Sequence, residues 1–134
     1  MTNLSQIEGI GKKYSAKLEK ARIETLEKLL LEGCKKKNRT ELAKATGISE
    51  KLILKWVNRA DLSRIQGIGT QYADLLEATG VDTVPELAKR KPEHLEQKIV
   101  EVNNQKNLVR RPPGLSRIKK WTAQAKKLPR IITF

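Results

Sequence analysis

Residues 4–14 read LSQIEGIGKKY and residues 62–72 read LSRIQGIGTQY, so one stretch of sequence occurs twice, 58 positions apart. The two copies share the glycine pair, the isoleucine between the glycines and the tyrosine that follows them. The agreement continues in register through Leu18 and Leu76, Thr25 and Thr83, and Leu29 and Leu87. Because apolar, glycine and aromatic positions all keep the same spacing, we interpret the chain as an internal repeat.

The composition favours an all-helical protein. Hydrophobic residues make up 38% of the 134 residues and aromatic residues 4%, and stretches that alternate between apolar and polar residues are rare. The repeat predicts an all-α fold of two tandem modules with about five short helices each. We place these modules at residues 1–60 and 61–128, followed by an extended tail over residues 129–134. Halves of roughly 60 residues are near the lower limit for an independent core, so we expect them to pack together.

Capping residues predict the helix boundaries of the first half. Thr25 and Ser49 are the expected N-caps of two helices, and Gly47 with Ile48 is expected to form the turn before the second of them. Between these helices, the lysine-rich residues 35–38 are predicted to form a loop before a helix over residues 40–46.

The second half departs from the first after Pro92. A helix over residues 93–102 is predicted to lead into a long polar connection over residues 103–114, because the two consecutive prolines at 112 and 113 cannot lie inside a helix. Ser116 is the expected cap of the last helix. Trp121 in that helix is expected to take the core position that Trp56 holds in the first half.

The charge balance favours a polyanionic partner. Lysine and arginine number 28 against 15 acidic residues, which gives a net charge of +13, and residues 102–134 contain no acidic residue. Such an excess is typical of proteins that bind nucleic acid, although an acidic protein surface is an alternative partner. The expected basic contact surface consists of Lys35, Lys36, Lys37, Arg39, Arg110, Arg111, Lys119, Lys120, Lys126 and Lys127.

The glycine pairs predict two phosphate sites built from the backbone. Glycine reaches positive φ easily, so these turns can point successive N–H groups outward. The helix that follows adds its unpaired first-turn N–H groups, which suit a phosphate oxygen. The predicted phosphate-binding residues are Gly9, Ile10, Gly11, Lys12 and Lys13 in the first copy, and Gly67, Ile68, Gly69 and Thr70 in the second. The first copy is the better candidate, because only its glycines are followed by lysines.

Each glycine turn resembles the helix-hairpin-helix motif of DNA repair, recombination and replication proteins. Ser15 and Ala73 stand where that motif has a small residue, four positions after the second glycine. The whole chain also resembles a bacterial and archaeal domain family of unknown function built from tandem helix-hairpin-helix units. The resemblance implies binding to the DNA backbone, in duplex or branched form, without marked sequence preference.

Two other functions fit parts of the pattern. The hairpins can be tight turns in an adaptor whose basic helical face docks an acidic protein. Residues 42–53 also have the spacing of a helix-turn-helix, but the expected recognition helix offers only Glu50, Lys51 and Lys55 for reading bases. Binding to the DNA backbone is therefore favoured over sequence reading.

The sequence gives no support for catalysis, a metal or a cofactor. It contains one cysteine, Cys34, and one histidine, His94, which together form no metal site, and no nucleophile is paired with a base. Some relatives of the motif are lyases that act through a lysine, but nothing singles out one lysine here. Without a signal peptide, a membrane-spanning run or a second cysteine, we expect a cytoplasmic protein that does not contact membranes.

Overall fold

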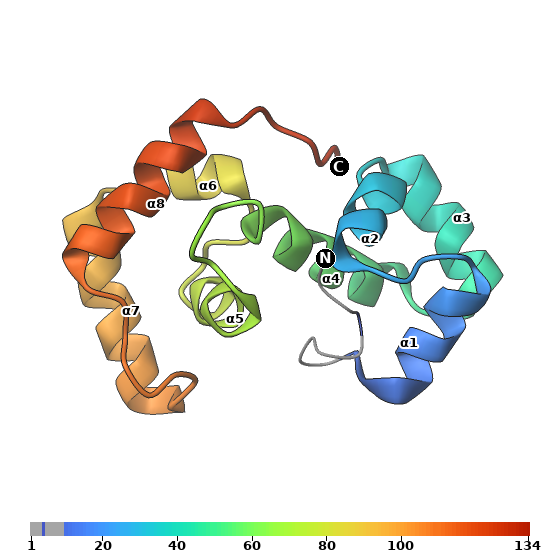
Figure 1. The fold of residues 1–134 in the computed structure, drawn as a ribbon, viewed down its shortest axis with the longest axis horizontal. Helices are drawn as coiled ribbons and strands as arrows, with labels where there is room; N and C mark the ends of the chain where they lie inside the picture. Colours follow the sequence, from blue (N-terminus) through green and yellow to red (C-terminus); the bar gives the residue numbers. More distant parts are fainter. Residues whose placement is uncertain (1–3, 5–9) are drawn as a thin grey trace. The chain divides into compact units, whose positions relative to one another are not determined.

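The computed structural model describes Leu4 and residues 10–134, and it consists of helices joined by short loops (Figure 1). The prediction of an all-helical fold is confirmed. The described part contains eight helices: α1 (Gly11–Lys20), α2 (Leu26–Gly33), α3 (Lys36–Thr46), α4 (Glu50–Leu62), α5 (Thr70–Ala78), α6 (Val84–Ala88), α7 (Pro92–Lys106) and α8 (Leu115–Lys127). None of the helices in these residues combines the length and the apolar character that crossing a bilayer requires.

The chain divides into two compact units. The first contains the residues up to Asp61 together with Ile131–Phe134, and the second contains Leu62–Arg130. Among the described residues each unit has four helices. The sequence also predicts a short helix over residues 4–8, which lies outside the described residues except for Leu4. In the second unit no separate helix precedes the glycine turn, because α4 ends at Leu62 and the next described residues form turns. Ile131–Phe134, within the predicted C-terminal tail, are grouped with the first unit.

The core of the first unit is formed by aliphatic side chains around Trp56. Leu18, Leu29 and Ile53 are fully buried there, and Trp56 is 1% exposed. The ring of Tyr14 packs against Trp56 with 5.2 Å between the ring centroids and 58° between their planes. This pairing holds the start of α1 against α4.

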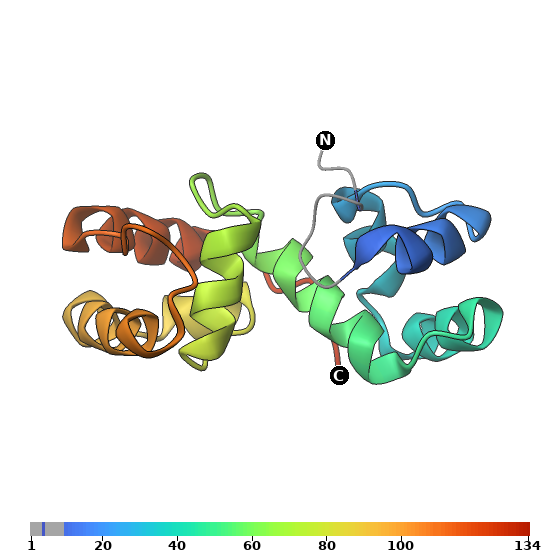
Figure 2. The same ribbon diagram turned by 90° about the horizontal axis from the view of Figure 1, so that it is seen from below.

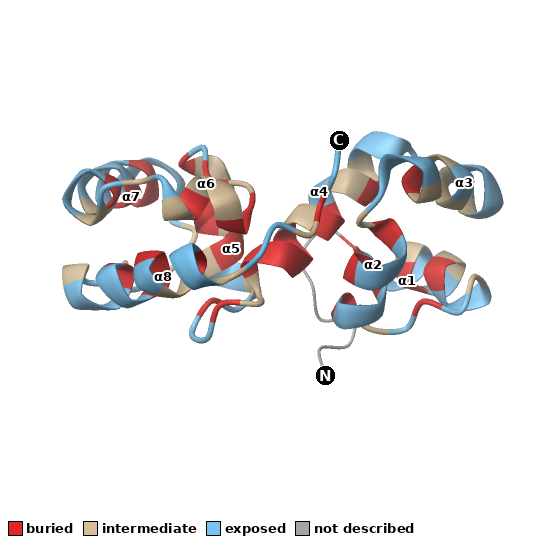
Figure 3. Cartoon of the chain, turned by 90° about the horizontal axis from the view of Figure 1, so that it is seen from above, coloured by how far each residue is buried: buried red, intermediate tan, exposed pale blue. Residues whose placement is uncertain are grey.

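The core of the second unit repeats this arrangement around Trp121. The ring of Tyr72 lies 5.3 Å from Trp121 with an interplanar angle of 56°, which matches the pair in the first unit. In this unit α8 packs against α6 and α7, and α5 packs against α7 (Figure 2). Buried residues line the sides of α7 and α8 that face this core, while their outer sides are exposed (Figure 3). The tyrosine–tryptophan pair of the sequence repeat thus recurs with nearly the same geometry in both cores.

Several local predictions are confirmed. The Thr25 hydroxyl accepts a hydrogen bond of 3.1 Å from the N–H of Lys28, and the Ser49 hydroxyl accepts one of 3.2 Å from Leu52, as N-caps do. Gly47 ends α3 in the left-handed conformation with φ of +75°, which glycine adopts at little cost.

Three boundary predictions are wrong. Residues 36–38 are helical, because α3 begins at Lys36 and lysine is a good helix former. Ser116 is not a cap, because α8 begins one residue earlier, after Gly114. The helix predicted over residues 93–102 continues to Lys106. Its end is held by the side-chain amide of Asn103, which makes two hydrogen bonds of 3.0 Å with the backbone of Val109.

Candidate nucleic-acid interface

The first glycine turn presents an open backbone at the start of α1. Ile10 is 1% exposed and anchors the turn in the core, while Gly11 is exposed and has φ of +62°. Apart from its chain neighbours and the backbone of its own helix, no atom of the described residues lies within 4 Å of the place that a Cβ would occupy on Gly11. An approaching group can therefore reach the backbone here. Gly9, the other predicted glycine of this turn, lies outside the described residues.

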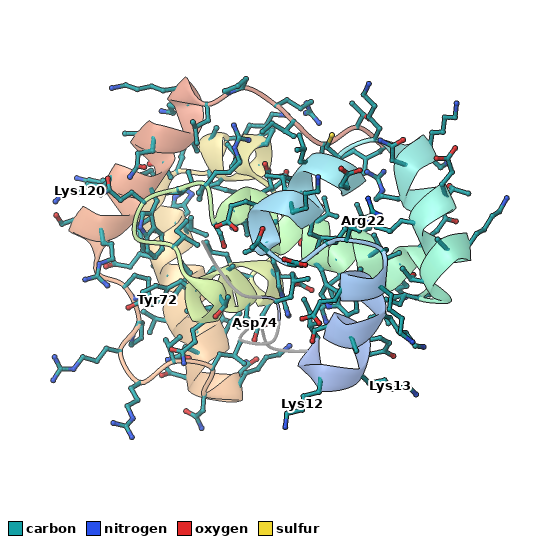
Figure 4. All side chains as sticks on the ribbon, turned by 45° about the vertical axis from the view of Figure 1, so that its right-hand side comes forward. Lys12, Lys13, Arg22, Tyr72, Asp74 and Lys120 are labelled. Carbon is teal, nitrogen blue, oxygen red and sulfur yellow. The ribbon has the colours of Figure 1, made fainter. Side chains whose placement is uncertain are left out.

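Two lysines place positive charge next to this open backbone. Lys12 and Lys13 are exposed in the first turn of α1, which contains no acidic residue. Their side chains extend outward from the start of the helix (Figure 4). The first-turn N–H groups of a helix have no partner within it and carry its positive dipole end. Amide hydrogens and ammonium groups therefore gather around one exposed position.

The small residue behind each turn is buried. Ser15 is 5% exposed and its hydroxyl donates a hydrogen bond of 3.4 Å to the carbonyl of Lys12. Ala73, at the equivalent place, is fully buried. A larger side chain at either position would push the turn away from its core.

The second glycine turn differs from the first in its backbone. Gly67 has φ of +97°, and a Cβ there would stand 3.1 Å from Nε1 of Trp121, so this glycine is packed against the indole. Gly69, the counterpart of Gly11, has φ of −87°, which any residue can adopt. The turn is also held from the side, because the backbone N–H of Gln66 donates a hydrogen bond of 3.0 Å to the side-chain oxygen of Gln124.

The two glycine turns also differ in the charge of the residues that follow them. The residues that open α5 are Thr70 and Gln71, which carry no charge, and the first turn of that helix has no acidic residue. Gly69 is exposed, with open space where a Cβ would stand. The second turn therefore offers backbone amides without the lysines of the first.

Most of the predicted basic surface is exposed. The lysine cluster lies at the start of α3, and the remaining residues lie on α8 or on the loop before it. Lys119 is close to Glu93, with 4.0 Å between its Nζ and a carboxylate oxygen. The exposed members are Lys35, Lys36, Lys37, Arg110, Arg111, Lys119, Lys120, Lys126 and Lys127.

Arg39 is predicted to belong to the basic contact surface, and this prediction is wrong because the side chain is buried. It is only 4% exposed, and its guanidinium donates to the carbonyls of Gly33 at 2.9 Å, Cys34 at 3.1 Å and Thr133 at 2.7 Å. Burial lowers the pKa of this group from its usual value. Arg39 therefore ties the end of α2 to the last residues of the chain, and it is not available to a partner.

Arg117 is a candidate binding residue that the sequence prediction missed. Its guanidinium donates a hydrogen bond of 3.0 Å to the hydroxyl of Tyr72 and lies 5.7 Å from the centre of that ring. The signal was the position of Arg117 three residues before Lys120, which puts both on one side of α8.

Taken together, the fold and this surface define a basic, all-helical protein with a duplicated glycine turn at the start of a helix. The chain belongs to the family described as a domain of unknown function, DUF4332, whose model matches residues 8–128. That description assigns no activity and names no ligand. No curated protein and no solved structure gives a significant match to the chain.

Proposed function

We propose that this protein binds DNA through the phosphate backbone, without marked sequence preference, and that the first glycine turn is its main contact. The observation that carries the proposal is the start of α1, where Gly11 leaves the backbone open and Lys12 and Lys13 are exposed. In this interpretation both turns are of the helix-hairpin-helix type, in tandem modules.

The donors explain why the binding would not depend on sequence. Backbone amides and lysine ammonium groups bind phosphate oxygens, which are the same at every nucleotide. Arg, Asn and Gln, which read base edges through paired hydrogen bonds, are absent from the first turn of α1, and its two lysines stand beside the open backbone of Gly11, where they suit phosphate. The proposed role is therefore to hold DNA in repair, recombination or replication.

A salt titration tests the proposal. We expect the affinity for a fluorescent duplex of mixed sequence to fall steeply with salt, with a log–log slope of about −4 to −7, if roughly five to eight phosphates are neutralised. Fluorescence anisotropy measures this slope. A chain that fails to bind at low salt would contradict the proposal and leave the adaptor function as the better one, which a pull-down that survives nuclease treatment would support.

Charge reversal at the first turn tests its leading role. We expect Lys12→Glu with Lys13→Glu to weaken duplex binding by about tenfold or more, on the order of 1.4 kcal/mol, because the amides remain while the field around them reverses. Thr70→Glu at the second turn should have a smaller effect.

The matched control for this test is Lys44→Glu with Lys51→Glu. It makes the same charge change at two exposed positions of the same unit, away from the glycine turn. Anisotropy titrations at one salt concentration compare the variants. If the control weakens binding as much as the turn variant does, net charge alone governs the affinity, and the first glycine turn is not the main DNA contact.

A further inference from the structure

The second unit contains two grooves that share one wall. The first has a volume of about 720 Å³ and runs between the second glycine turn and α8; the second, of about 920 Å³, runs between α5 and the loop that follows α7. Tyr72, Arg111 and Pro112 line both of them. The two grooves therefore adjoin at these residues, and we call them together the track.

The charged residues that line the track are all positive. Arg111, Arg117 and Lys120 line the first groove, and Arg110 joins Arg111 in the second. The residues that line the two grooves include no aspartate or glutamate. Cations that share a concave surface reinforce each other's potential, so a polyanion is the ligand that the track favours.

The other lining groups suit bases rather than a plain phosphate surface. Tyr72 is half-buried, is backed by Trp121 and lies on both grooves. Gln71, Asn104 and Asn107, whose side chains end in amides, are among the residues that line the second groove. Amides hydrogen-bond to base edges, and an aromatic ring between cations is typical of grooves that bind unpaired strands.

A duplex cannot use these groups in the same way. Its bases are stacked inside the helix and its phosphates lie on a convex surface, so a groove lined by amides and a tyrosine would contact only its backbone. An unpaired strand can follow the track and turn its bases into it. Tyr72 on α5 and Lys120 on α8, both labelled in Figure 4, line the first groove.

We propose that this track binds single-stranded DNA. The inference rests on the DNA-binding function proposed above and deepens it, because it gives the two units different ligands. The first unit would hold phosphates at its glycine turn, and the second would hold an unpaired strand along the track.

The test compares two DNA forms with the full chain. Arg111→Gln with Lys120→Gln removes two exposed track cations, and Lys89→Gln with Lys98→Gln removes two exposed cations of the same unit that line neither groove. Anisotropy is measured with labelled oligothymidylate and with a labelled duplex, and circular dichroism confirms that each variant is folded. We expect the track variant to lose about tenfold in affinity for oligothymidylate and less than about threefold for the duplex. The control should lose less than about threefold for both.

Each other outcome has a definite meaning. Equal losses for the two DNA forms, or a loss no larger than that of the control, would overturn the single-strand track while leaving duplex binding at the first turn intact. A loss of affinity for oligothymidylate alone in the track variant would support the track. If the Lys12→Glu, Lys13→Glu variant then binds the duplex as tightly as the unaltered chain, the first turn is overturned as the main contact. Failure of the unaltered chain to bind either DNA would overturn both proposals.

Discussion

Replacing Trp121 by alanine is expected to lower the free energy of unfolding of the second unit by about 3–5 kcal/mol. The indole is 1% exposed and packs against the ring of Tyr72. It also fills the space beside Gly67, where its Nε1 lies close enough to leave little room for a Cβ. Alanine would therefore leave a large cavity in the core. It would also remove the indole that packs against Gly67 in the second glycine turn.

Amide hydrogen exchange measured by mass spectrometry locates this loss. Trp121 belongs to the core of the second unit and Trp56 to that of the first, so Trp121→Ala should lower protection mainly in peptides from residues 62–130. Trp56→Ala is the matched variant and should act mainly on residues 10–61. Equal loss of protection across both units in either variant would contradict separate cores and indicate one cooperative structure. Urea denaturation followed by circular dichroism gives the total free-energy change.

The repeat made these two tryptophans predictable as core residues. Trp56 and Trp121 lie among aliphatic residues at helical spacing, and each has a tyrosine in the preceding glycine motif. The structure buries both indoles and pairs each with that tyrosine in nearly the same geometry. Apolar periodicity and capping signals extend over only a few residues, so they can be recognised from the sequence alone.

The difference between the two glycine turns was not predictable in the same way. Gly11 and Gly69 occupy equivalent places in the repeat, yet only Gly11 has a positive φ. Gly67 has Trp121 as a neighbour, which lies far away in the sequence. Backbone conformation at a turn depends on such tertiary neighbours, and no local pattern encodes them.

The candidate site likewise has one part that the sequence predicts and another that only the fold reveals. The exposed lysines at the start of α1 follow from the motif, because charged residues that open a helix usually face solvent. The track of the second unit joins residues from α5, α7, α8 and the loop before α8. Its acid-free C-terminal part was visible in the sequence as a basic segment, but the position of Tyr72 beside that segment was not.

Arg39 shows most clearly what the sequence conceals. Next to three lysines it has the pattern of a basic surface, and only the fold reveals Thr133, 94 residues later, as one of its acceptors. The N–H of Thr133 also donates a hydrogen bond of 2.8 Å to the carbonyl of Cys34, and Ile132 is buried in the core of the first unit. The end of the chain is thus held by a buried cation.

Arg39→Ala is therefore expected to destabilise the first unit by about 2–4 kcal/mol. It removes three hydrogen bonds from a charged donor and leaves the carbonyls of Gly33 and Thr133 without their guanidinium partner. Arg39→Lys should restore only part of the loss, because one ammonium cannot span acceptors that a planar fork reaches together. Urea denaturation followed by circular dichroism measures both changes.

The neighbouring Lys37 supplies the control, since it is exposed and Lys37→Ala removes one positive charge from the same helix. We expect that variant to change the stability by less than about 0.5 kcal/mol. Hydrogen exchange in the C-terminal peptide adds a local readout, because loss of the guanidinium should deprotect the amide of Thr133. If that amide stays protected in a folded Arg39→Ala protein, then the burial of Ile132 and the bond to Cys34 hold the end of the chain, and the arginine does not. Arg39→Ala should also weaken DNA binding no more than Lys37→Ala does in a folded protein, because a buried cation makes no contact with phosphate.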